Sequence, residues 1–162
     1  MLNAKKKPDG VVIGWTPVED IIPLRHRVLR QGMPIEAARF EGDDISHTRH
    51  VAAHLAGTEG GLSNPVCCAS FMLNAYNEAP AWQLRGMATE AKLQGLGLGA
   101  QLLAWAEREL RVHPGYPPRA RMLWCNARES AVKFYEKNGW KLVPGVFDIP
   151  TAGPHYKMTK GL

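Results

Sequence analysis

The sequence predicts an α/β chain of the mixed α+β type, with a central mixed sheet of six to seven strands and helices on both faces. Two observations support this: helical patterns separate groups of short apolar strands, and the expected order is β-α-loop-β-β-β-α-β-α-β-β. With 162 residues, the chain has the size of one ordinary domain. We therefore predict a single domain over residues 11–162, preceded by a flexible basic N-terminus at residues 1–10.

The first half of the chain predicts a strand, a helix and three further strands. A short strand at residues 11–15 leads into "TPVE" at 16–19, a capping-box pattern with proline at the first helical position. Apolar residues at helical spacing follow up to Gly32. Residues 33–44 predict a loop or short helix that could cover a site. Turn-rich segments then separate three expected strands of an antiparallel meander, at residues 47–55, 66–73 and 81–89.

The second half predicts two helices and three strands. Glycines at 95, 97 and 99 open a helix that should end near His113, before the strong break "PGYPP". The segment "ARMLWC" at 120–125 is typical of a buried strand. The next helix, within "NARESAVKFYEKNGW", should stop at Asn138-Gly139. Two final strands are expected at residues 140–149 and 154–160.

Composition and charge narrow the classes of function. The chain has no run of about 18 apolar residues, and its charged N-terminus has no apolar segment behind it, so we expect neither a membrane span nor a signal peptide. Three cysteines without C-x-x-C spacing favour a reducing compartment, with the cytoplasm as the default. The net charge of +5 comes from scattered basic residues, so we expect no nucleic-acid partner; a mild positive field would also attract a small polyanion.

The three glycines before a good helix are the main functional signal. Each loses about 1 kcal/mol of helix propensity relative to alanine, so a role other than helix formation is indicated. A strand, a glycine turn and a helix N-terminus together form an anion site, for which phosphate is the natural ligand. Neither the P-loop nor the G-x-G-x-x-G pattern fits, because no lysine follows the glycines and Leu102 stands at the third glycine position. An unfavourable helix start with no ligand is the alternative.

A third pattern does fit. Gln94-x-x-Gly97-x-Gly99 resembles the Q/R-x-x-G-x-G/A motif of the GNAT acyltransferase superfamily, which binds the pyrophosphate of coenzyme A. The segment at 126–140 resembles the next motif of that superfamily, in which a strand leads into a helix carrying A-x-x-F-Y. The ending "GVFDIPTAGPHYKM" is similar to an ElaA-like branch. Departures from these patterns are Arg128, Trp140 and Ala91, where glutamine, phenylalanine and proline are common.

The resemblance implies a GNAT fold and an acetyl-CoA-dependent N-acyltransferase, in which a primary amine attacks the thioester directly. A coenzyme A-binding module without turnover is the alternative. No metal is expected. The partners would be acetyl-CoA and a small-molecule or peptide amine, and a homodimer is a candidate assembly.

The resemblance also implies roles for particular residues. Tyr135 would protonate the leaving thiolate, and His155 would take a proton from the ammonium substrate. Glu36 and Arg85 are candidates for acceptor recognition. Asn126 is a further candidate for cofactor contact, although it lies two residues earlier than the asparagine of many GNAT members. Gln94 opens the cofactor-binding loop. The pyrophosphate would be held there by backbone N–H groups at Gly95, Leu96, Gly97, Leu98, Gly99 and Ala100, and the pantetheine arm and the oxyanion would meet the strand at Met87, Ala88 and Thr89.

Several of these residues also have purely structural interpretations. Tyr135, next to Phe134, would serve as a core residue, and His155 as a hydrogen-bonded hairpin residue. Cys125 is expected to be a small buried apolar residue, because no histidine pairs with it in a recognisable pattern. The adjacent Cys67 and Cys68 point to opposite faces of a strand, which excludes a shared metal. On the same reasoning, the histidine at 47 would lie on the opposite strand face from those at 50 and 54, which argues against a metal site formed by all three.

Overall fold

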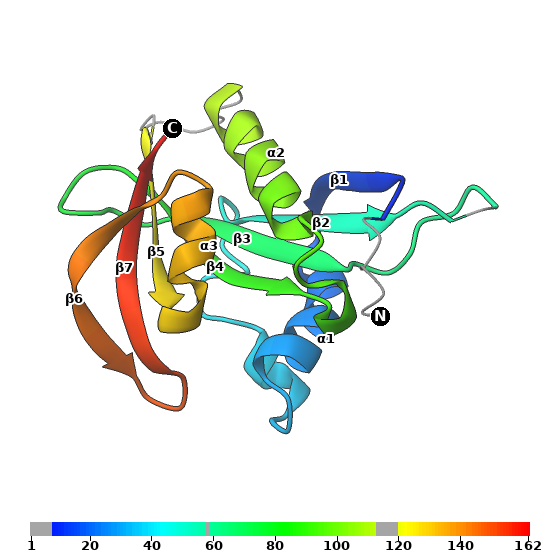
Figure 1. Cartoon of the computed structure of the whole chain (residues 1–162), viewed down its shortest axis with the longest axis horizontal. Helices are drawn as coiled ribbons and strands as arrows, with labels where there is room; N and C mark the ends of the chain where they lie inside the picture. Colours follow the sequence, from blue (N-terminus) through cyan, green and yellow to red (C-terminus); the bar gives the residue numbers. More distant parts are fainter. Residues whose placement is uncertain (1–7, 58, 113–119) are drawn as a thin grey trace, which may run out of the picture. The chain divides into compact units, whose positions relative to one another are not determined.

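The computed structural model describes residues 8–57, 59–112 and 120–162. In this part of the chain, seven strands and three α-helices follow the predicted order (Figure 1). The predicted basic terminus lies mostly outside the described residues, as does the expected helix end near His113. The elements are β1 (Val11–Thr16), α1 (Val18–Leu29), β2 (Arg49–Leu55), β3 (Cys67–Leu73), β4 (Trp82–Thr89), α2 (Leu98–Val112), β5 (Met122–Arg128), α3 (Val132–Lys137), β6 (Lys141–Ile149) and β7 (Gly153–Gly161), with short 3-10 helices at Ile35–Ala38, Ala91–Leu93 and Glu129–Ala131.

The strands form one sheet in the order β1-β2-β3-β4-β5-β7-β6. β1 and β2 are antiparallel, β4 and β5 are parallel, and β7 is antiparallel to both β5 and β6. The parallel ladder is short and pairs Trp82–Leu84 of β4 with residues 123–125 of β5. A mixed seven-stranded sheet confirms the predicted fold class.

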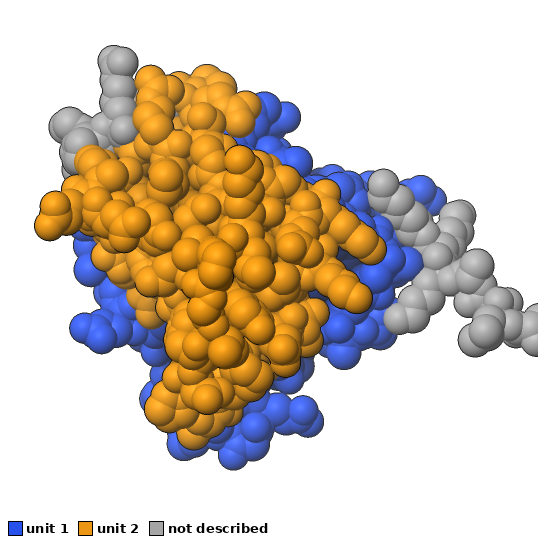
Figure 2. Space-filling view, turned by 60° about the vertical axis from the view of Figure 1, so that its left-hand side comes forward, with its two compact units in different colours: residues 1–70, 86–108 blue, residues 71–85, 109–162 orange. Residues whose placement is uncertain are grey.

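Residue contacts divide the chain into two compact units (Figure 2). The first unit comprises Met1–Ser70 and Gly86–Arg108, and the second comprises Phe71–Arg85 and Glu109–Leu162. The boundaries fall inside β3, β4 and α2, so the two units share these elements. The prediction of one domain over residues 11–162 stays a prediction.

In the first unit, helices cover both faces of the sheet (Figure 1). The apolar side of α1, with Ile21 at its centre, packs in one cluster with Ala52 of β2. On the other face, the ring of Trp15 in β1 lies edge-on to that of Trp105 in α2, with the ring centres 5.1 Å apart. Trp15 pairs with Val51, the neighbour of Ala52, and successive strand residues point to opposite faces. The helices α1 and α2 therefore lie on opposite sides of β1 and β2.

The structure corrects two sequence predictions. The capping box at "TPVE" is wrong: Pro17 is the N-cap residue of α1 and makes no side-chain cap, while the Thr16 hydroxyl donates to the Asp20 carboxylate. The predicted strand ending at Cys125 is too short, because β5 continues to Arg128. Pairing with β7 explains the extension, since the antiparallel register runs on to Arg128 and its partner His155. Asn126 is consequently a strand residue.

A buried ion pair ties four segments of the first unit together. The guanidinium of Arg25 in α1 is fully buried, and its Nη1 lies 2.6 Å from Oδ2 of Asp43. Its Nη2 donates to the Ser70 hydroxyl on β3, and its Cζ lies 4.6 Å from the centre of the Phe40 ring. On β4, a Cβ added at Gly86 would lie 2.7 Å from Arg25 Nε, and Gly86 has φ +57°. Glycine is therefore required there for both space and backbone conformation.

His50 completes this network in its neutral form. Its Nε2 lies 2.9 Å from the carbonyl oxygen of Asp43, which only accepts, so Nε2 carries the proton. Its Nδ1 then accepts the hydrogen bond of the Ser70 hydroxyl. Burial lowers the pKa of His50, outweighing the contributions of Asp43, which raise it. The structure places this histidine in the core, away from any metal role.

No helix in the described ranges combines the length and apolar character needed to cross a bilayer.

Candidate active site

The glycine loop lies between β4 and α2 in the first unit and begins with a tight turn. After the 3-10 helix Ala91–Leu93, the Gln94 side chain reaches back and donates from Nε2 to the carbonyl oxygen of Thr89, at 3.0 Å. This bond closes the turn on the end of β4. Gln94 is exposed, and its own backbone N–H donates to the carbonyl oxygen of Ala91, at 3.4 Å. Its role in cofactor binding stays a prediction.

Gly95 and Gly97 both have φ +82°, in the left-handed region that side chains disfavour. No atom beyond the neighbouring residues lies within 4 Å of a Cβ added at either position. The two glycines are therefore required by backbone conformation and not by packing inside the chain. The structure adds this conformational reason to the sequence argument, which rested on ligand approach alone. The open space beside both positions leaves the loop backbone accessible.

The helix α2 begins directly after Gly97. Its first backbone bond runs from Gln101 N to Gly97 O, at 3.1 Å. Leu98 is buried and anchors the first turn to the core, while Gly99 and Ala100 are only partly buried. The first N–H groups of a helix have no acceptor inside it, and its N-terminus carries a partial positive charge. This arrangement can bind a phosphate or pyrophosphate group.

The end of β4 places a buried alanine between two half-buried residues. The side chain of Ala88 is buried in the apolar cluster around α1, so only its main chain can serve a ligand. The Thr89 hydroxyl lies 3.1 Å from Sγ of Cys67, and its carbonyl accepts the Gln94 bond. Met87, between Gly86 and Ala88, is half-buried. Gln94 and the four residues Gly86–Thr89 all belong to the first unit.

Tyr135 lies in α3, in the second unit, and is buried at 6% exposure. Its ring packs edge-on against Phe134 and Trp140, with centres 5.2 and 5.3 Å away. Burial raises the pKa of Cys125 to about 12, against the opposing effect of a hydrogen bond with Tyr135. The thiol is therefore protonated at neutral pH, which supports the expectation that Cys125 is not a nucleophile. The helix stops as predicted, with Gly139 at φ +83°.

His155 lies on β7, also in the second unit, and is 5% exposed. It pairs with Arg128 of β5 on one side and Phe147 of β6 on the other. Its Nδ1 lies 2.7 Å from the carbonyl oxygen of Gly153, which only accepts, so Nδ1 carries a proton. In the neutral ring, Nε2 is then the basic nitrogen. This tautomer is the one needed to accept a proton at Nε2.

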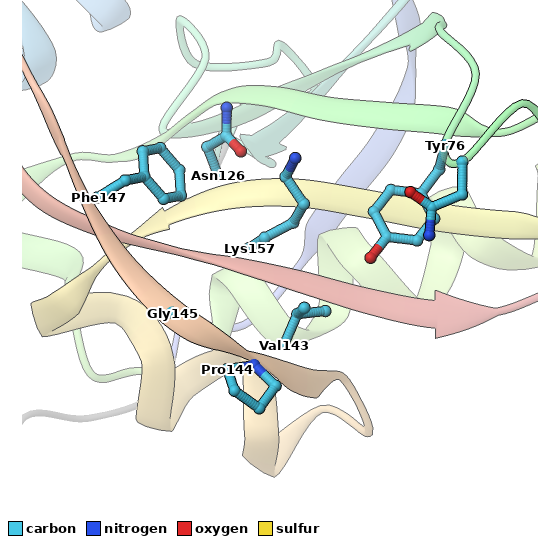
Figure 3. A pocket seen from close by; sticks show the side chains of 8 residues that line it. Tyr76, Asn126, Val143, Pro144, Gly145, Phe147 and Lys157 are labelled. Carbon is cyan, nitrogen blue, oxygen red and sulfur yellow. The ribbon is translucent and has the colours of Figure 1, made fainter.

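A pocket of about 490 Å³ lies within the second unit and was not predicted (Figure 3). Lys157 of β7 and Asn126 of β5 are direct strand partners, and both line it. Figure 3 shows their side chains rising from neighbouring strands between Phe147 and Tyr76. The alternation of side chains along β7, which places Lys157 on the same face as His155, is the one sequence signal for it. The sequence does not show that β7 pairs with β5, so it could not indicate that Asn126 lies beside Lys157.

The remaining candidates are distributed over both units. Glu36 is exposed on the 3-10 helix Ile35–Ala38 of the first unit, which fits the predicted short helix. Arg85 belongs to the second unit, and its Nη1 lies 3.4 Å from Sδ of Met72. Neither lines the pocket around Lys157. Within the described residues, no three His, Cys, Asp or Glu side chains are placed to hold a metal ion.

Comparison with known proteins gives consistent results. The model of the acetyltransferase (GNAT) domain family matches residues 49–142. An uncharacterized N-acetyltransferase of Bacillus subtilis, YitI, is 34% identical over 148 residues, which cover 90% of this chain and 92% of that protein.

Two solved structures share the fold. Escherichia coli ElaA superimposes with a TM-score of 0.67 at 16% identity, covering 92% of this chain and 99% of that one. An aminoglycoside 6'-N-acetyltransferase complexed with coenzyme A superimposes with a TM-score of 0.66, also at 16% identity, covering 93% and 96%.

Proposed function

Because the chain belongs to the GNAT family of N-acetyltransferases, we propose that it transfers an acetyl group from acetyl-CoA to a primary amine by direct attack. The observation that carries the proposal is the open glycine loop, which leads from β4 into the positive end of α2. The coenzyme A bound to the aminoglycoside acetyltransferase of the same fold supports this choice of donor. Three free, buried cysteines support a reducing compartment such as the cytoplasm.

The loop and β4 would hold the donor. Backbone N–H groups from Gly95 to Ala100 would bind the pyrophosphate, and Gly95 and Gly97 keep that backbone in a conformation that exposes it. The main chain of Met87, Ala88 and Thr89 would meet the pantetheine arm and donate a hydrogen bond to the oxyanion that forms on the thioester carbonyl. The donor supplies the activated acetyl group, and no covalent bond to the chain is needed.

Two side chains would move protons. His155 accepts a proton at Nε2 from the incoming ammonium, because its Nδ1 is already committed to Gly153. The neutral amine then forms the C–N bond, and collapse of the tetrahedral intermediate breaks the C–S bond. Tyr135 donates its hydroxyl proton to the departing thiolate. The nitrogen loses its second proton to solvent as the amide forms, and exchange with solvent returns a proton to the tyrosinate and removes the one held by His155. The products are the acetylated amine and coenzyme A.

A thermal-shift measurement with acetyl-CoA, ATP and NAD tests the donor assignment. At about 100 times Kd, acetyl-CoA should stabilise the fold by roughly 2.7 kcal/mol, a rise in Tm of about 5–10 °C for a chain of this size. ATP and NAD lack the pantetheine arm and should shift Tm much less. Equal shifts from all three would reduce the loop to a general phosphate site. A thiol-release assay with a panel of amines then distinguishes an enzyme from a coenzyme A-binding module without turnover.

A further inference from the structure

We propose that the pocket around Lys157 binds a carboxylate carried by the acceptor, so that the substrates are primary amines that also bear a carboxylate. This inference rests on the proposed function for the identity of the occupant. The presence of a carboxylate site in the pocket does not depend on turnover, and it can be tested separately.

The shape of the pocket follows from an irregularity in β6. The register with β7 pairs Leu142 with Met158 and then moves to Val146 and Tyr156, so residues 143–145 lie opposite Lys157 alone. Pro144 has no backbone N–H to donate, and Gly145 has φ +112°. The bulge thus takes the β6 backbone out of the ladder beside Lys157, and all three bulged residues line the pocket. Its volume of about 490 Å³ is in the range of small-molecule sites, roughly 300–1,000 Å³.

The ammonium group of Lys157 is held by two aromatic rings. Its Nζ lies 5.2 Å from the centre of the Trp124 ring and 5.8 Å from that of Tyr76. Trp124 is fixed in turn by its Nε1, which donates to the carbonyl oxygen of Asn74 at 2.8 Å. A cation over aromatic faces is restrained without being neutralised, so its charge remains available to a ligand. Within the described residues, Lys157 forms no salt bridge.

The rest of the lining is either neutral or apolar. Asn126 and Asn77 contribute amides, and Tyr76 and Phe147 contribute rings. Asn77 lies in a turn where two successive non-glycine residues, Asn77 and Glu78, have positive φ, +48° and +65°. The bridge between Tyr76 and Ala79 closes this turn and holds Asn77 at the pocket. Positive φ at both central residues is typical of a type I′ hairpin turn, which favours asparagine, so the position of Asn77 at the pocket follows from the turn between β3 and β4.

The charge balance selects the ligand. Among the residues that the structure describes, the pocket lining contains one cation and no acidic side chain. A polyamine with no anionic group would face uncompensated repulsion from Lys157, because its amines are protonated at neutral pH. A carboxylate would receive a charged donor from Lys157 and neutral donors from the two amides, and the aromatic side chains would pack against an apolar spacer. The one positive charge of Lys157, together with two neutral amides, balances a ligand group that carries a single negative charge.

The test compares amines that differ only in this group. The probes are para-(aminomethyl)benzoate and para-(aminomethyl)benzamide, together with shorter and longer pairs of the same design. The ring separates the two groups, so the basicity of the amine barely changes within a pair. For the wild type, kcat/KM should favour the carboxylate by about tenfold or more in at least one pair, as expected for a hydrogen bond to a charged group.

Three variants locate the effect. Lys157→Met keeps the length of the side chain and should abolish the preference, while Lys157→Arg should retain most of it. Lys141→Met is the matched control, since Lys141 is exposed on β6, lies outside the lining and carries the same charge. A general loss of attraction would affect both methionine variants equally. Equal rates for acid and amide, or a preference that survives Lys157→Met, would overturn the inference while leaving acetyl transfer established.

A binding measurement tests the carboxylate site even if the protein acetylates none of the amines. Titration of the labelled protein with para-methylbenzoate and para-methylbenzamide, followed by NMR, should show tighter binding of the acid to the wild type but not to Lys157→Met. That result would support the carboxylate site even if the proposed acetyl transfer failed. Absence of selective binding would reject the site whatever the enzyme assay shows.

Discussion

Arg25 and Asp43 form an ion pair of 2.6 Å between side chains that are 0% and 1% exposed. Removing one member of a buried pair leaves the other charged and unsolvated, which costs about 3–5 kcal/mol. Asp43→Asn should therefore lower the free energy of unfolding by an amount in this range, as measured by urea denaturation. Arg27→Met is the matched control, because Arg27 pairs with Glu90 while half exposed, and its loss should cost about 0–1 kcal/mol. Similar losses in the two variants would contradict a structural role for the buried pair.

The buried His50 should make stability depend on pH. Burial lowers its pKa in the folded chain below the ordinary value of 6.5, so the unfolded chain binds a proton first as the pH falls. Its contribution to stability is full above pH 6.5 and is lost as the pH falls from there through the folded pKa. His50→Gln should flatten this part of the stability curve, by at most about 1.4 kcal/mol per pH unit. His54→Gln serves as a control. An unchanged slope in His50→Gln would show that other groups cause the acid sensitivity.

Substitutions at Gly97 and Gly99 separate effects on backbone conformation from effects on coenzyme A binding. Gly97→Ala forces a side chain into φ +82° and should destabilise the fold by about 1 kcal/mol while weakening coenzyme A binding. Gly99 lies inside α2, where alanine is favoured, so Gly99→Ala should stabilise the helix by roughly 0.5–1 kcal/mol. If the backbone of this turn contacts pyrophosphate, Gly99→Val should still reduce coenzyme A affinity by about tenfold. Calorimetric titration with undiminished affinity in Gly99→Val would remove Gly99 from the binding site.

Tyr135→Phe tests the general acid with little change in packing. The ring contacts with Phe134 and Trp140 remain, so kcat should fall on the order of 100-fold while coenzyme A affinity stays close to that of the wild type. Loss of the hydrogen bond to Cys125 should cost about 1 kcal/mol of stability at most. Tyr156→Phe, on β7, provides the control for a lost hydroxyl. Full activity of Tyr135→Phe with several donors would leave this residue with a core role only.

His155→Gln tests the proton acceptor through the pH profile. The glutamine amide can still donate to the Gly153 carbonyl but cannot accept a proton from an ammonium. We expect kcat/KM to fall by about 100-fold near neutral pH, with partial recovery at high pH, where more of the amine is already neutral. A rate that falls by the same factor at every pH would indicate positioning and not proton transfer.

Much of the fold follows from local signals in the sequence. The helix stop at Asn138-Gly139 was predicted because turn and cap chemistry is local. For residues 33–44 the sequence left a loop and a short helix open, and the structure has a 3-10 helix at Ile35–Ala38. The glycine loop was also predictable, since its three glycines and the following apolar pattern are contiguous. The two errors have different causes. The predicted "TPVE" capping box was wrong because Pro17 occupies the cap position, and β5 was predicted too short because its last residues depend on a distant partner strand.

The sequence predicted that the strands at 47–55, 66–73 and 81–89 are neighbours, but it did not show which strands far apart in the chain pair with one another. Arg25, Asp43, Ser70 and His50 come from four separate segments, and nothing in any one of them shows that a charge will be buried and paired. The sequence alone determined the order of the elements, the end of α3 and which backbone is bare, because these depend on neighbours along the chain. Only the tertiary structure decided that Lys157 faces Asn126 beside a bulge in β6, because strand register sets which side chains meet, and register is fixed by contacts between segments far apart in sequence.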